Sequence, residues 1–195
     1  WARWHMCGLC EQRYHGVVAC ALGWACWKTY VGRPETDQFQ RNAMTELGNG
    51  LFAVKHHADA LSVREAKVAL LRRFGGTESN ILVAMSNLSS TYGKMGRFDD
   101  ARQMDQMVYS GRLKLHGWKH ERTIRAANNY ANSLLNLKRF EEAKAVLGES
   151  RPTAIGVLGE CHDLTLRTRW TYARAFYEDH GATLDDLHEA VTMLE

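Results

Sequence analysis

The clearest pattern in the chain is the stretch Ala127–Ala143, which reads ANNYANSLLNLKRFEEA. Forty-two residues earlier, Met85–Ala101 reads MSNLSSTYGKMGRFDDA. Both stretches end in Arg-Phe, two acidic residues and Ala. The same shift superposes two Gly-x-x-His spacings, 117–120 and 159–162. The chain therefore contains an internal repeat, which is the usual sign of a repetitive architecture.

Further copies of the pattern lie on both sides of this pair. A step of 42 residues onward places Asn128–Ala131 on Trp170–Ala173, and two additional residues are then needed before the next match. A step of 41 residues backwards places His57–Ala60 on Phe98–Ala101. The predicted repeats are about residues 38–79, 80–121, 122–163 and an incomplete unit at 164–195.

The apolar spacing within each unit is helical. One face of the third unit carries residues at i, i+3, i+4 and i+7, namely Ala127, Tyr130, Ala131 and Leu134. A turn follows, and a second helix begins at an acidic pair, which suits the positive end of a helix dipole. Because one helix pair cannot bury its apolar face alone, consecutive pairs must stack. The predicted fold is all-α, a right-handed α-solenoid of stacked antiparallel helix pairs.

This pattern resembles the tetratricopeptide repeat (TPR), and looks most like the longer repeat of kinesin light chains. The resemblance is carried by the 42-residue period, the Asn-Asn-Tyr-Ala-Asn run, the Arg-Phe-Glu-Glu-Ala turn and the Gly-x-x-His spacing. It covers residues 38–195 and implies a TPR-like superhelix that binds other proteins. The fourth unit departs from the pattern at Arg169 and at the insertion around Asp179–Gly181.

Cys7 and Cys10 form a Cys-x-x-Cys spacing, which lets two thiolates reach one tetrahedral zinc ion. The surrounding segment is similar to the closing knuckle of RING-CH-type zinc domains, so residues 1–13 are interpreted as a remnant of a zinc-knuckle segment. That resemblance implies that both cysteines bind zinc only in a longer parent chain, and no cofactor is expected for this chain by itself. The alternative is that they are free thiols at a frayed end.

Residues 14–34 are predicted to hold an N-terminal capping helix that covers the open end of the first repeat. Gly32 and Pro34 end it. Its apolar residues favour one buried face, made of Val17, Val18, Ala21, Leu22, Ala25 and Cys26.

In a helix pair of TPR type the first helix lines the concave wall of the solenoid. The residues opposite the core stripe then form a polar wall, which in the first two units includes Asn42, Thr45, Asn49, Val83, Ser86 and Ser90. The candidate partner-binding residues on this wall are Asn87, Arg125, Asn128, Asn129, Asn132, Arg167, Trp170 and Arg174.

The chemistry of these residue types favours peptide binding. Asparagine offers donors and acceptors to the backbone of an extended segment, and arginine adds charge-assisted bonds to carboxylates. The arginines suggest a mildly acidic partner segment, and Trp170 suggests an aromatic contact. The alternative interpretation is an ordinary solvated helix face.

The composition limits the other functions. Lys and Arg total 25 against 22 Asp and Glu, and this net charge of +3 supplies no basic patch for nucleic acid. No apolar run reaches the roughly 18 residues that span a bilayer. The sequence also lacks a phosphate-binding loop and a Gly-x-Ser-x-Gly elbow. We therefore expect no enzymatic, nucleic-acid or membrane role.

Five cysteines without regular disulfide spacing favour a reducing compartment, so the cytoplasm is the predicted location. The chain begins with Trp1, and its last helical pattern still runs at Glu195, which suggests a piece of a longer protein. The predicted function is a non-catalytic scaffold that binds a peptide or partner protein on its concave surface. Two alternatives stay open: the substrate-recognition part of a RING-CH-type E3 ubiquitin ligase, and a cargo adaptor for a motor.

Overall fold

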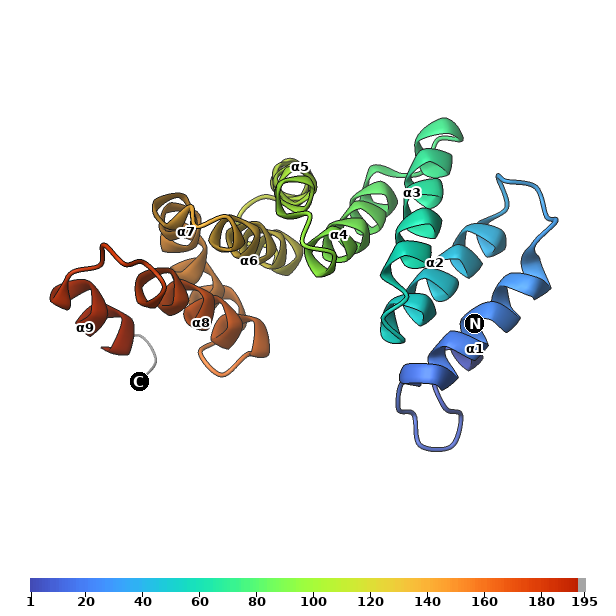
Figure 1. Ribbon diagram of the computed structural model, residues 1–195, viewed down its shortest axis with the longest axis horizontal. Helices are drawn as coiled ribbons and strands as arrows, with labels where there is room; N and C mark the ends of the chain where they lie inside the picture. Colours follow the sequence, from blue (N-terminus) through green and yellow to red (C-terminus); the bar gives the residue numbers. More distant parts are fainter. Residues whose placement is uncertain (193–195) are drawn as a thin grey trace. The chain divides into compact units, whose positions relative to one another are not determined.

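The structure describes residues 1–192, apart from the side chains of Asp186 and Glu189. Within these residues the regular secondary structure is helical (Figure 1). This computed structural model confirms the all-α prediction. A short 3-10 turn, Ala2–Trp4, precedes the α-helices. Within the described residues these are α1 (Gly16–Tyr30), α2 (Gln38–Ala53), α3 (His57–Arg73), α4 (Glu78–Lys94), α5 (Phe98–His116), α6 (Glu121–Asn136), α7 (Phe140–Leu158), α8 (Asp163–Tyr177) and α9 (Leu184–Thr192).

The chain divides into two compact units, Trp1–Gly96 and Arg97–Glu195. The first holds α1 to α4 and the second α5 to α9. Each predicted repeat contains two of these helices. The first helices of the four repeats are α2, α4, α6 and α8, and each begins near the start of its repeat. The division between the units falls inside the predicted repeat 80–121. Residues 193–195 of the last predicted repeat lie outside the described part of the chain.

The turn inside each hairpin repeats one backbone conformation. The residue before the N-cap of α3, α5 and α7 has a positive φ, at Lys55 (64°), Gly96 (75°) and Lys138 (58°). Only glycine adopts this left-handed region without steric cost. The backbones of Lys55 and Lys138 are therefore strained, and the surrounding turn imposes this conformation on them. The second helix then begins with acidic residues in its first turn, as the sequence predicts.

The turns between hairpins use the Gly-x-x-His spacing. Gly117 and Gly159 end α5 and α7 with positive φ values of 73° and 89°. The imidazole Nδ1 of His120 accepts a hydrogen bond from the Arg122 amide at 3.1 Å, and His162 caps α8 in the same way. The histidines therefore satisfy free helix-start amides.

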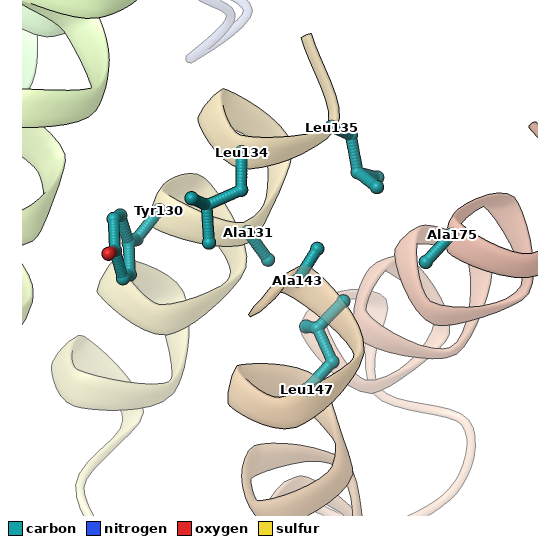
Figure 2. Close-up of a cluster of buried hydrophobic side chains, with 7 residues drawn as sticks. All are labelled: Tyr130, Ala131, Leu134, Leu135, Ala143, Leu147 and Ala175. Atoms are coloured by element: carbon teal, nitrogen blue, oxygen red, sulfur yellow. The ribbon is translucent and has the colours of Figure 1, made fainter. Parts of the chain in front are cut away.

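The core of the second unit forms where α6, α7 and α8 meet. Figure 2 shows Ala131 of α6 facing Ala143 of α7, and Leu134 of α6, Leu147 of α7 and Ala175 of α8 belong to the same buried cluster. The alanines permit close helix approach, because a larger side chain would separate the helices. Ala60 and Ala101, at the same repeat position as Ala143, are also buried.

The same pair of repeat positions is in contact in successive repeats, but different residue types occupy the two positions. In the first unit the buried Arg64 donates to Thr91 Oγ1 at 2.6 Å. One repeat later the Ser133 hydroxyl donates to the carboxylate of the buried Asp105. One further repeat places Leu147 and Ala175 in the same apolar cluster. The geometry of the stack is therefore repeated, while the side chains that fill it are not.

Helix α1 packs on α2 through glycine, and the predicted buried face of α1 is wrong in part: Cys26 is buried and Leu22 half-buried, whereas the other four residues are exposed. A Cβ at Gly23 would lie 2.7 Å from the Glu46 carbonyl oxygen, and one at Gly50 would lie 2.7 Å from Cys20 Cα. The two backbones thus approach as closely as two glycines allow. This places Cys26 in the interface and leaves Val17 78% exposed. Val18, Ala21 and Ala25 are exposed as well.

Candidate protein-binding site

Asn132 links α6 to α8 in the second unit. Its Nδ2 donates to Thr171 Oγ1 at 3.4 Å and to the Asn128 carbonyl at 2.9 Å. Its Oδ1 accepts from Arg174 Nη1 at 3.3 Å. The structure therefore brings two of the predicted wall residues, Asn132 and Arg174, into one hydrogen-bonded network with Thr171.

Asn128 and Asn129 lie on the same helix but differ in their surroundings. Asn128 is 7% exposed, and its Oδ1 is buried without a hydrogen-bond partner in the described residues. A buried acceptor without a donor is costly, so a donor reaching it would be favourable. Asn129 is half-buried, and its carbonyl accepts from Ser133. The asparagines of α6 are therefore partly structural.

The three predicted arginines each pair with a carboxylate one turn away on their own helix. The prediction of a mildly acidic partner segment rests on the charge of these arginines, and the neighbouring carboxylates offset part of that charge. Residues four apart on a helix face the same side, so these pairs were readable from the sequence. Exposed pairs add little stability, but they reduce the positive charge that a partner would meet. The pairs are Arg125 with Glu121, Arg167 with Asp163 at 3.0 Å, and Arg174 with Glu178 at 2.7 Å.

A groove of about 490 Å³ opens between α8 and α9 beside this network. Two of the predicted residues, Trp170 and Arg174, lie on its wall. Trp170 is 61% exposed and Tyr177 is 80% exposed, which is unusual for large aromatic side chains. The groove is lined by Trp170, Ala173, Arg174, Tyr177, Glu178, Leu187, Ala190 and Val191.

No residue of α9 is among the predicted wall residues, although α9 forms one side of this groove. Leu187, Ala190 and Val191 follow the i, i+3, i+4 spacing of an apolar helix face. Ala190 is buried against Ala173 and Phe176, whereas Val191 is 57% exposed. The spacing was readable, but only the packing of α9 on α8 shows that the face is left partly open.

The wall residues of the first unit lie around a second pocket. This pocket of about 540 Å³ is bordered by α2, α3 and the start of α4, and three predicted wall positions, Asn42, Thr45 and Val83, line it. Asn87 lies on α4 away from that lining, and its carbonyl accepts from Arg64 Nη1 at 2.7 Å. The complete lining is Gln38, Arg41, Asn42, Thr45, Lys67, Leu71, Gly75, Gly76, Thr77, Asn80 and Val83.

Lys67 gives this second pocket its charge, and the sequence analysis did not single it out. The Lys67 ammonium donates to Thr45 Oγ1. Burial lowers the pKa of Lys67 to about 8, and nearby Glu46 offsets this only in part. A lysine on the second helix of a hairpin looks solvated in sequence, because only the structure shows that its stem reaches across to α2.

Cys7 and Cys10 lie in a short turn closed by a β-bridge between Met6 and Arg13. Amide donors from Cys10 and Leu9 lower the pKa of the Cys7 thiol to about 7. Among the described residues, no group of three or more Cys, His, Asp or Glu side chains could hold a metal ion. Two thiols supply half of a tetrahedral set, so these residues do not fit zinc by themselves. Zinc ligation in a longer parent chain stays a prediction.

In the described part of the chain, α1 to α9 include no segment with the length and hydropathy of a membrane span.

Comparison with known proteins supports the repeat interpretation. A family model for the tetratricopeptide repeat matches residues 81–121, which contain most of α4 and all of α5. A comparison with curated protein sequences gives no match.

Solved structures with a similar fold cover most of the chain. A putative kinesin light chain of Podosopora anserina with nearly identical TPR-like repeats is 17% identical, with a TM-score of 0.73 over 91% of this chain and 82% of that chain. A variant of it gives a TM-score of 0.74 with the same identity and coverage. BtubC (BKLC) from P. vanneervenii is 14% identical, with a TM-score of 0.70 over 90% of this chain and 69% of that chain. The fold is therefore a TPR-like repeat fold.

Proposed function

We propose that this chain is a non-catalytic scaffold that binds a segment of another protein in the groove between α8 and α9. The observation that carries the proposal is the exposure of Trp170 and Tyr177 at a mostly apolar groove. Exposed aromatic side chains in a concave surface supply much of the binding energy in protein interfaces. TPR-like folds generally mediate protein–protein interaction, which supports the same class of function.

The groove and the adjacent network suit two parts of a bound segment. An apolar side chain would fill the space between Trp170 and Val191, where it would be removed from water. The neighbouring Asn132 and Arg174 offer polar groups to the backbone that carries this side chain. The proposed occupant is thus a peptide segment with one bulky apolar anchor. Because the arginines are paired with carboxylates, the proposal requires no particular net charge on this segment.

This proposal is tested by selecting binders from a random peptide library displayed on phage. The selected peptides should contain a recurrent apolar anchor. Their affinity for the Trp170→Ala variant should fall at least about tenfold, since truncating an aromatic hot spot costs about 2 kcal/mol or more. Isothermal titration calorimetry measures the affinities directly.

Trp24→Ala is the matched control, because Trp24 is an exposed tryptophan of α1, 45% accessible, in the other unit. It should bind the selected peptides as the wild type does. Failure to select any peptide would contradict the proposal. Equal affinity of the Trp170→Ala and Trp24→Ala variants would also contradict it.

A cytoplasmic location belongs to the same proposal, and so does the absence of catalysis. The ubiquitin-ligase and motor-adaptor alternatives stay hypotheses, because no specific observation favours either. The upstream sequence separates them: six more Cys or His residues in ligand spacing would favour a ligase, and a heptad-patterned coiled coil would favour a motor adaptor.

A further inference from the structure

We propose that the pocket between α2, α3 and α4 in the first unit binds a phosphoryl group carried by a side chain of a partner protein. The identity of the carrier rests on the proposed function, whereas the anion chemistry rests on the pocket alone. The pocket measures about 540 Å³, which admits a phosphorylated side chain.

The lining of the pocket is positively charged, and nearby Glu46 offsets the charge of Lys67 only in part. Arg41 and Lys67 line it, and no carboxylate side chain belongs to the lining. Among the described residues, Lys67 has Thr45 as a hydrogen-bond partner and forms no ion pair. A partly buried ammonium whose charge is only partly offset is costly, so an anion entering the pocket would be stabilised there.

The donors around the pocket suit an oxyanion with three acceptor oxygens. Gln38 and Asn42 on α2 and Asn80 on α4 carry side-chain amides, and Lys67 approaches from α3. Donors therefore come from three helices, whereas a planar carboxylate with two oxygens would leave some of them unused. The N-terminus of α4 opens on the same pocket at Thr77, and its partial positive charge is offset in part by Glu78 in the first turn of the helix.

Binding should depend on pH through Lys67. Burial holds the pKa of Lys67 at about 8, so the amine is mostly charged at pH 7 and mostly neutral at pH 9. The charged groups that act on it are Glu46 and Arg41 on α2 and Arg64 on α3. The α4 residues in the lining, Asn80 and Val83, do not titrate. Affinity for a phosphoryl group should therefore fall between pH 7 and 9.

The test uses four probes and the complete chain. Three are acetylated, amidated tripeptides, Gly-X-Gly, in which X is phosphoserine, glutamate or serine; the fourth is inorganic phosphate. Backbone amide resonances of Gly75, Gly76 and Thr77, which line the pocket, report binding by NMR titration. The phosphoserine tripeptide should give saturable shifts with higher affinity than the other probes. Because phosphoserine is nearly dianionic above pH 7, any loss of affinity at pH 9 reports on the protein.

Three variants localise the effect. Lys67→Met should weaken phosphoserine binding at least tenfold while keeping the helical circular dichroism spectrum. Lys67→Arg should retain binding and lose most of the decrease between pH 7 and 9, because arginine stays charged. Lys94→Met removes the same charge from an exposed site at the other end of α4 and should leave binding unchanged.

Several results would overturn the proposal. Glutamate-tripeptide binding that equals phosphoserine binding would make the pocket a carboxylate site, and tighter binding of inorganic phosphate would remove the side-chain carrier. Unchanged binding by a folded Lys67→Met variant would remove the pocket itself. Trp170→Ala should leave the phosphoserine titration unaltered, so failure here is distinguishable from failure of the peptide groove.

Discussion

Two cationic side chains of α3 are partly or fully buried, and they are satisfied to different degrees. Arg64 is 8% exposed and donates to the Asn87 carbonyl, Thr91 Oγ1 and Asn49 Oδ1. Burial lowers the pKa of Arg64 to about 10, so it stays charged at neutral pH. Lys67, one turn later, has the Thr45 hydroxyl as its partner. Arg64 therefore joins three helices, whereas Lys67 carries a charge that the fold does not fully compensate.

The charge of Lys67 should lower stability at neutral pH in a phosphate-free buffer. Its pKa is about 8 in the folded chain, against 10.5 for a lysine that is fully exposed to water, as in the unfolded chain. Below pH 8 both states are protonated and the cost is fully present; between pH 8 and 10.5 the unfolded chain binds more protons, so stability rises. Lys67→Met should therefore be more stable than wild type at pH 7, by on the order of 1 kcal/mol.

Urea denaturation of wild type and Lys67→Met at pH 7 and pH 10 measures this difference. The advantage of the variant should shrink at the higher pH. A difference that does not change with pH, or a variant less stable at pH 7, would show that the ammonium is compensated in the folded chain.

At the scale of elements, small residues decide which helix faces meet. The predicted repeats bury an alanine at Ala60, Ala101 and Ala143, while the α1–α2 interface uses Gly23 and Gly50. The difference matters because a glycine contact brings backbones together and leaves no room for any side chain.

Gly50→Ala should destabilise the chain despite the higher helix propensity of alanine. The new Cβ would lie 2.7 Å from Cys20 Cα and 2.8 Å from the Ala19 carbonyl oxygen, so backbone would have to move. Overpacking of this kind costs about 1–3 kcal/mol. Gly148→Ala in the interior of α7 is the control: its Cβ meets nothing within 4 Å, so a gain of up to about 1 kcal/mol is expected. Thermal denaturation of both variants gives the sign, and a stabilised Gly50→Ala would refute the close contact.

How far the sequence predicts these elements depends on whether the signal is periodic. The helices that carry Tyr130 and Tyr92 were predictable because apolar residues recur on one helical face every 42 residues. The buried face of α1 was not, since Val17 and Val18 are the more hydrophobic residues and yet lie outside. A prediction from hydrophobicity compares side chains with one another. The close contact at Gly50 instead forms because glycine has no side chain, so hydrophobicity does not reveal it.

At the scale of the whole molecule, two candidate sites occupy separate compact units. The first unit contains the cationic pocket around Lys67, and the second contains the apolar groove beside Trp170. The sequence predicted Trp170 and Arg174 as binding residues, because wall positions follow from the repeat register. It could not predict the groove itself, which depends on how α9 packs on α8.

The central claim is that the α8–α9 groove receives a segment of another protein. The most direct measurement is an NMR chemical-shift map of the complete chain as a selected peptide is added. We expect shifts at the Trp170 indole N–H, the Asn132 side-chain amide and the backbone amides of α8 and α9. Shifts confined to α5 and α7, with the Trp170 indole resonance unmoved, would contradict it.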